Sequence, residues 1–250
     1  PNPGVEYIQW PESYPIDCEA FMKDNSGKYV KYLWDPNSYI NIMVYNFTTE
    51  PNSNSVTLGI SHIPFSTTGK HYLEGLGGTD YSHLTLANLQ FPLSVSINSL
   101  YINEESTPTE YSTADIAVTL AHELGHYLGL HHVFAETDNG TCEDTDYCKD
   151  TKSYNKQEYD SKCDYIYENE REKYTFKNLV KRTGCDGIEF ISYNIMDYAI
   201  SYSNQFTQNQ RERIRHVLSY SPLIPGPKNG DIDTRALNEG PLVLPIRTIK

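Results

Sequence analysis

Residues 122–132 read His-Glu-Leu-Gly-His-Tyr-Leu-Gly-Leu-His-His, and this stretch decides both the expected fold and the expected chemistry. It lies in a segment whose apolar residues recur at helical spacing, so we expect a helix with one buried face. The face consists of Ile116, Leu120, Leu124, Tyr127 and Leu128. Ser112 is predicted to cap the helix, with Asp115 near its first turn, and Gly129 is predicted to end it.

Three histidines of this stretch have the spacing of a metal site. His122 and His126 are four residues apart, which places them on one face of a helix, and neutral imidazole is a good zinc ligand. A glycine at position 129 can adopt a positive φ and turn the chain, so that His132 returns as a third ligand. Three protein ligands leave a fourth position open, which is typical of catalytic zinc.

Glu123 follows the first histidine directly, so it lies beside the predicted metal and not on it. From there its carboxylate can take a proton from an attacking water molecule. The sequence therefore predicts one catalytic zinc ion, with Glu123 as the general base.

A second motif, Asn-Ile-Met-Asp-Tyr at 194–198, accompanies the histidines. The two motifs together resemble those of the metzincin clan of zinc peptidases, in which a Met-turn forms a hydrophobic floor beneath the metal. The resemblance gives this role to Met196, which is not a ligand. It also makes Tyr198 the tyrosine that assists near the metal, for example by donating a hydrogen bond to the developing oxyanion.

Within that clan, the chain resembles the pappalysin family. Val-Phe follows His132, Asp-Tyr follows Met196, and the later pattern Phe-Thr-x-x-Gln-x-x-Arg spans residues 206–213. The resemblance implies an endopeptidase that cleaves protein or peptide substrates. It also implies that a strand near 95–102 binds the substrate backbone by strand addition.

The implied fold is an α/β (α+β) catalytic domain with a twisted, mostly parallel sheet and the active-site helix, above an irregular lower subdomain that contains the Met-turn. We expect an N-terminal extension at 1–28 and an upper subdomain at 29–132. A lower subdomain with cysteine-rich loops and a closing helix follows at 133–221. Residues 222–250 are expected to form an extended tail, because they are rich in Pro and Gly.

The pattern of residues predicts several further elements. Strands are expected at 39–45, 56–60 and 94–102, where β-branched and aromatic residues gather or alternate with polar ones. A helix is expected at 207–218, after a Thr cap. Residues 136–185 have little periodicity and are expected to be mostly ordered loops.

Four of the five cysteines lie between residues 142 and 185, without the C-x-x-C spacing of a thiolate zinc site. They fit two disulfides in an oxidising compartment, or free buried thiols in a cytosolic protein. The family resemblance implies a Cys142–Cys185 bond, which leaves Cys148 with Cys163. Cys18 fits neither account.

Acidic residues at 144, 146 and 150 lie in the same region. The resemblance implies structural calcium there, with Asp144, Asp146 and Asp150 as candidate ligands. A solvated acidic loop fits these residues equally well.

The overall composition limits the classes of partner. Twenty basic and 33 acidic side chains give a formal charge of −13, which argues against a nucleic-acid partner. No apolar run reaches the roughly 18 residues of a membrane span. The expected function is a zinc endopeptidase that is secreted or attached to the cell surface. The alternative is a catalytically silent, zinc-containing binding or adhesion module, against which the intact Glu123 argues.

Overall fold

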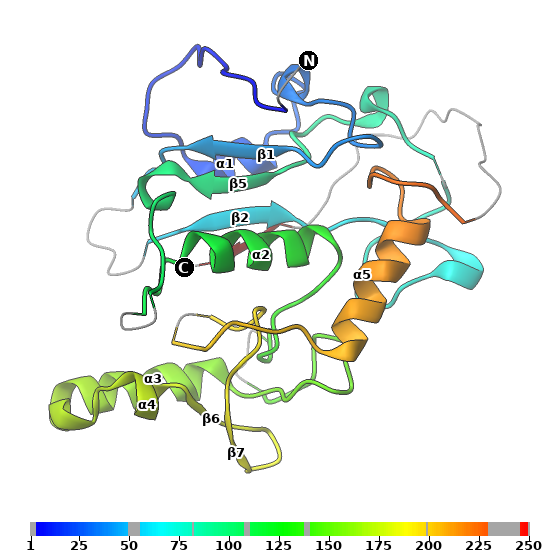
Figure 1. The fold of residues 1–250 in the computed structure, drawn as a ribbon. Helices are drawn as coiled ribbons and strands as arrows, with labels where there is room; N and C mark the ends of the chain where they lie inside the picture. The colour runs from blue at the N-terminus through cyan, green and yellow to red at the C-terminus, as the bar shows by residue number, and fades with distance from the viewer. Residues whose placement is uncertain are drawn as a thin grey trace.

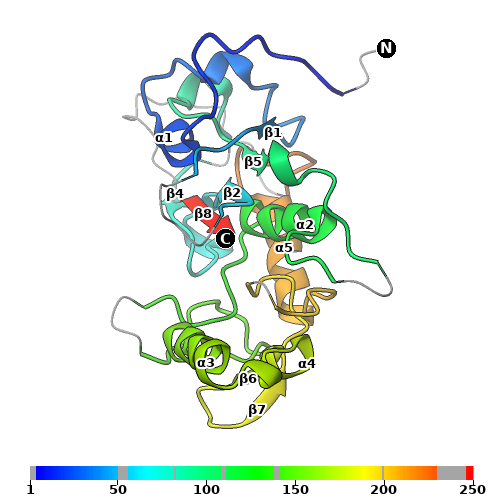
Figure 2. The same cartoon turned by 90° about the vertical axis from the view of Figure 1, so that its left-hand side faces the viewer.

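The fold has an upper part built on a sheet and a lower part that contains a long helix and a small hairpin (Figure 1). The computed structural model describes residues 4–49, 56–81, 83–107, 111–137, 141–198, 200–229 and 246–249. Figure 2 shows helix α2 (Ile116–Tyr127) beside the sheet, with α3 (Lys156–Asn169) and α4 (Phe176–Leu179) below it. The predicted α/β class is confirmed. The division into subdomains at 29–132 and 133–221 stays a prediction.

The sheet has four strands, in the order β1 (Ile42–Tyr45), β5 (Val95–Asn98), β2 (Gly59–His62) and β8 (Ile246–Ile249). β1 pairs with β5 in parallel, whereas β2 pairs antiparallel with both β5 and β8. The sheet is therefore mixed, with one parallel and two antiparallel pairings where the sequence predicted mostly parallel ones.

The position of β5 corrects one prediction. The strand ends at Asn98, a 3-10 turn follows at Ser99–Tyr101, and both strand edges are already occupied by β1 and β2. All four of its residues are buried. A substrate backbone has no free edge to pair with on β5, so the expected substrate strand at 95–102 is wrong.

Apart from one 13-residue helix, the remaining elements are short. They are α1 (Cys18–Lys23), the parallel pair β3 (Ser66–Thr67) and β4 (Gly78–Thr79), the hairpin β6 (Lys181–Thr183) and β7 (Glu189–Ile191), α5 (Gln208–Tyr220), and 3-10 turns at Val30–Tyr32, Gly69–His71, Leu86–Asn88 and Arg171–Lys173.

The apolar face of α2 packs as predicted. Tyr127 belongs to the main core cluster, which also contains Val95 and Ile97 of β5. The other four residues of the face are partly buried and pack against this cluster: Ile116, Leu120, Leu124 and Leu128. The cap differs from the prediction, because Asp115 begins the helix. Its carboxylate accepts hydrogen bonds from the backbone N–H groups of Ala117 and Val118. The negative charge of an Asp at this position is also stabilised by the positive end of the helix dipole.

The prediction of loops at 136–185 is wrong in its central part. The 14-residue helix α3 begins at the Asn155 cap, whose side chain accepts from the N–H of Glu158. Its only fully buried residue is Ile166. A helix that buries so little leaves no apolar stripe in its sequence, and for that reason the periodicity did not reveal it.

Helix α5 is confirmed. Thr207 caps it, and the side chain of Gln210 accepts a hydrogen bond from the Thr207 backbone N–H, which completes a capping box. The Gln210 amide also exchanges hydrogen bonds with the side chain of Asn194, so the capped end of α5 holds the 194–198 segment in place.

One disulfide, Cys142–Cys185, joins the segment after the histidine motif to the β6–β7 turn, as the resemblance implied. The second predicted pair is wrong, because Cys148 and Cys163 are both free. Cys148 is buried near Asp146 and Arg213, whereas Cys163 on α3 lies beside Tyr159. Cys18 packs as a small apolar side chain in a core cluster with Phe21 and Ile60.

The expected extended tail at 222–250 contributes β8, and residues 230–245 lie outside the described part of the chain. Among the helices that the structure describes, each is too short or too polar to cross a bilayer.

Candidate metal centre and active site

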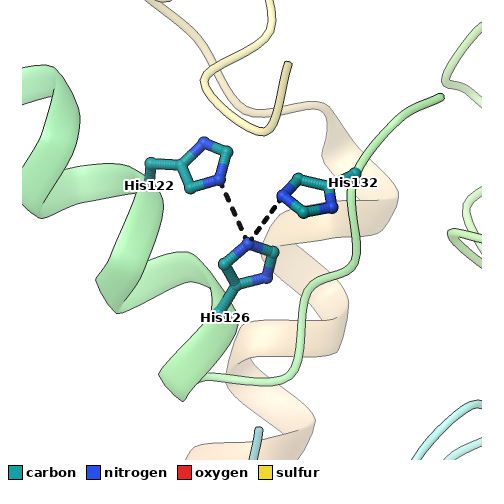
Figure 3. A group of neighbouring side chains, drawn as sticks. All are labelled: His122, His126 and His132. Carbon is teal, nitrogen blue, oxygen red and sulfur yellow. Dashed lines mark hydrogen bonds between the residues drawn. The ribbon is translucent and has the colours of Figure 1, made fainter. Parts of the chain in front are cut away.

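Three buried histidines converge at the end of α2 (Figure 3). His122 and His126 come from adjacent turns of the helix, and His132 from the segment that follows it. The Nε2 atom of His126 lies 3.1 Å from Nε2 of both His122 and His132. Three nitrogens at about 2.0–2.1 Å from one tetrahedral zinc would be roughly 3.3 Å apart, so the arrangement fits this metal.

The outer nitrogen of each ring fixes the tautomer. Each Nδ1 donates to an oxygen that can only accept, and this leaves the Nε2 lone pair directed at the shared point. The acceptors are the carbonyl of Ile195 for His122 at 2.7 Å, the carbonyl of Leu130 for His126 at 2.9 Å, and the Glu136 carboxylate for His132 at 2.6 Å.

Burial keeps these histidines neutral, as metal ligands must be. Desolvation, followed by the nearby charge of His132, lowers the pKa of His122 to about 3. Desolvation likewise lowers the pKa of His126 well below its ordinary value. Burial also lowers the pKa of His132, although the hydrogen bond to Glu136 opposes the shift.

The turn after α2 brings His132 to the other two. Gly129 has φ +89°, in the left-handed region that favours glycine. Its N–H donates to His126 O and the Leu130 N–H donates to Gly125 O, which together make a Schellman motif. Arg213 of α5 donates to the Gly129 carbonyl from Nε at 3.3 Å and Nη2 at 3.1 Å, so the closing helix holds this turn.

Glu123 is fully buried and lies against the backbone of β2. A Cβ atom on Gly59 would lie 2.6 Å from Glu123 Cγ and 2.8 Å from its Oε1. The absence of a side chain at position 59 therefore makes room for the Glu123 carboxyl group. This contact was not predictable from the sequence, because no local pattern relates a strand glycine to a helix glutamate 64 residues later.

Met196 lies directly beneath α2, fully buried. A side chain on Gly125 would collide with its sulfur atom, so the glycine of the histidine motif allows the methionine to approach the helix. The Met196 carbonyl accepts from the N–H of Val133, one residue beyond His132. Tyr198 is also close, with its ring centroid 4.7 Å from that of His132.

Glu136 is a further site residue that the sequence analysis missed. Its carboxylate binds His132, as above, and also contacts Arg247, whose Nε lies 3.3 Å from Oε1. Burial by itself raises the pKa of Glu136, but hydrogen bonds from His131 and His132 outweigh burial and lower it well below its usual range. Metal-bound histidines commonly donate their second ring N–H to a carboxylate, and this tendency is the one signal that could have identified Glu136 from the sequence.

A buried ion pair supports the 194–198 segment. Arg182 Nη2 lies 3.3 Å from Asp197 Oδ2, and both side chains are fully buried. Asp197 also accepts hydrogen bonds from Tyr154 Oη at 2.5 Å and from Ser192 Oγ. Arg182 in turn donates to the Leu179 carbonyl at 2.7 Å.

Replacing the arginine is expected to destabilise the protein strongly. Arg182→Ala leaves the Asp197 carboxylate buried without its cation, which typically costs about 3–5 kcal/mol. Urea unfolding of the zinc-loaded protein measures the change, with Arg215→Ala as the control because Arg215 is exposed. A loss below about 1 kcal/mol in Arg182→Ala would contradict this account of the pair.

The predicted calcium site gains no support. Among the described residues, the His122–His126–His132 group is the one cluster with metal-ligand spacing, and Asp144, Asp146 and Asp150 do not form another. The Asp150 carboxylate instead accepts from the N–H of Asn209, at the start of α5.

Residues 77–219, more than half of the chain, match the pregnancy-associated plasma protein-A family, peptidase family M43. The chain belongs to this family. The predicted pappalysin membership is thereby confirmed, and the family is one of peptidases.

Three curated relatives of this chain are extracellular metalloproteases from Arthroderma benhamiae, Trichophyton verrucosum and Arthroderma otae. They are 37%, 37% and 38% identical over 97 residues, which cover 38% of this chain and 29% of each relative. The match thus spans less than a third of the length of these relatives. Mature mirolysin of Tannerella forsythia, solved in complex with a cleaved peptide, is similar with a TM-score of 0.43 and 21% identity, over 73% of this chain and 53% of that one.

Proposed function

We propose that this peptidase is a zinc-dependent endopeptidase, with His122, His126 and His132 as the metal ligands and Glu123 as the general base. The observation that carries the proposal is the convergence of three Nε2 atoms, each fixed by an acceptor on its Nδ1, next to a buried carboxyl group. A zinc ion bound there supplies Lewis acidity, which polarises the scissile carbonyl and makes water more acidic.

Glu123 moves the proton in this scheme. Its carboxylate takes a proton from the attacking water and passes it to the leaving amine as the peptide bond breaks. The contact with Gly59 supports the assignment, because the β2 backbone limits where the carboxyl group can go. A confined base spends less of its time in unproductive orientations.

We propose supporting roles for Met196 and Tyr198. Met196 forms the apolar floor of the site, which agrees with its complete burial against Gly125. Tyr198 is proposed to donate a hydrogen bond to the oxyanion that develops during cleavage. The closeness of its ring to His132 supports this role.

We also propose that the protein acts on peptides outside the cytoplasm. The Cys142–Cys185 disulfide supports an oxidising compartment. The extracellular metalloproteases of the three fungi support the same location.

A digest of a diverse peptide library, read by mass spectrometry, tests the function. The zinc-loaded protein is expected to cut internal peptide bonds, and a zinc chelator is expected to abolish the cuts. Chelator-resistant cuts would contradict the proposal. A protein that retains zinc and makes no cut would fit the alternative, a silent zinc-containing binding module.

A further inference from the structure

The strand β8, from the C-terminal end of the chain, covers the outer edge of β2. The pairing is antiparallel, with Gly59 opposite Ile249, Ile60 opposite Thr248, Ser61 opposite Arg247 and His62 opposite Ile246. Figure 2 shows β8 beside β2. Without β8, β2 would present a free edge, and free edges accept an extended peptide as an added strand.

This particular edge borders the active site. Gly59 of β2 lies against Glu123, as described above, and Ile249 is its partner across the strand pair. β8 also lies against α2, the helix that carries Glu123 and two of the metal ligands. A strand on this edge therefore passes beside the reacting groups.

Arg247 connects β8 to the metal ligands. Its Nε atom lies 3.3 Å from Glu136 Oε1, and the same oxygen accepts from His132 Nδ1 at 2.6 Å. The Arg247 side chain is 30% exposed and that of Glu136 is 20% exposed. The ion pair is therefore shielded from solvent more than a typical surface pair, and screening weakens it less.

We propose that residues 246–249 are a peptide ligand built into the chain. They occupy the edge where an extended peptide substrate would pair, and Glu136 receives their basic side chain. The inference rests on the proposed function and deepens it, because it names the ligand class: an extended strand with an arginine opposite Ser61. A substrate has to displace β8 from the edge before it can bind.

The physical reason is competition at high effective concentration. A segment that is tethered to its own site competes with added peptides at an effective concentration of about millimolar. This effective concentration does not fall when the protein is diluted. When β8 occupies the edge for most of the time, an added peptide can bind only the small fraction of molecules in which the edge is open. The apparent affinity for the added peptide is reduced in proportion to that fraction. Weakening β8 should therefore lower KM and leave kcat unchanged.

Arg247→Ala in the zinc-loaded protein tests this. We expect KM for a fluorogenic peptide to fall about three- to tenfold, with kcat and zinc affinity unchanged, since loss of a charge-assisted contact has effects of this size. Arg215→Ala, which removes an exposed arginine of α5, is the matched control and should change nothing. An unchanged KM overturns the proposal. So does a fall in kcat with loss of zinc, because Arg247 would then support His132 through Glu136.

A peptide added in trans tests the role of the arginine. A synthetic peptide with the sequence of residues 241–250 is expected to inhibit the Arg247→Ala protein competitively. The same peptide with Ala in place of its Arg should inhibit about three- to tenfold less well. Equal inhibition by the two peptides would overturn Glu136 as the receiving group.

Hydrogen exchange gives a readout that needs no activity. In wild type β8 should protect the amides of β2 that point away from β5, and Arg247→Ala should speed their exchange; the His62 N–H, which donates to the Ser94 carbonyl on the β5 side, is the internal reference. This result stands whether or not the protein cleaves peptides, so a failure of the endopeptidase proposal is distinguished from a failure of this one. Exchange rates that do not differ between the two proteins contradict the built-in ligand.

Discussion

Glu123→Gln is expected to lower the rate of peptide cleavage by about 10²- to 10⁴-fold while the protein still binds zinc. The substitution keeps the size of the side chain, so it still fits against Gly59. It removes the carboxylate that takes the proton from water, and an amide cannot replace it. The expected loss therefore lies in kcat, with KM little changed.

The rate is measured with a fluorogenic peptide and the zinc content by metal analysis of the same sample. Glu168→Gln serves as the control, because Glu168 is exposed on α3, away from the site. A Glu123→Gln protein that retains near wild-type kcat would remove Glu123 from the mechanism. A protein that loses its zinc would show that the side chain supports the metal site instead.

His126→Ala is expected to have the second large effect, because His126 is the central member of the group. Its Nε2 atom is within 3.1 Å of both other ligand nitrogens. Structural sites bind zinc with a free energy of about 10–16 kcal/mol, which is shared among their ligands. Loss of one ligand therefore costs roughly 3 kcal/mol, or about 10²-fold in zinc affinity. Cleavage at limiting zinc should fall at least as far.

His131→Ala is the informative comparison. His131 is also buried and directly precedes His132, but its Nε2 donates to the Gly75 carbonyl at 3.0 Å and does not point at the shared site. Zinc titration of the chelated proteins should show weak binding for His126→Ala and nearly native binding for His131→Ala. The reverse order would mean that the ligand set is misassigned.

The sequence predicted most of the centre of this site and little of its support. His122, His126 and His132 were predictable because a helix period and one glycine turn determine their geometry locally. Glu136 was not predicted, because the three residues between it and His132 lie outside regular structure and carry no period. Gly59 and Arg247 reach the site only through strand pairings distant in sequence, which no local pattern encodes.

The same distinction explains the fold. Helices α2 and α5 were predicted because each has apolar residues at helical spacing and a recognisable end, Gly129 for the first and Thr207 for the second. Helix α3 was missed because it buries little more than Ile166. Residues 246–249 were expected to belong to an extended tail. They form the strand β8 because they pair with β2, and that partner is distant in sequence.

Zinc titration of the metal-free protein, with cleavage of one internally quenched peptide as the readout, tests the central claim most directly. The account predicts no cleavage without metal, and a linear recovery that ends at one zinc per chain. It also predicts that Glu123→Gln binds the same single zinc without recovering activity. Full cleavage by the metal-free protein, or recovery that does not depend on His126, would contradict it.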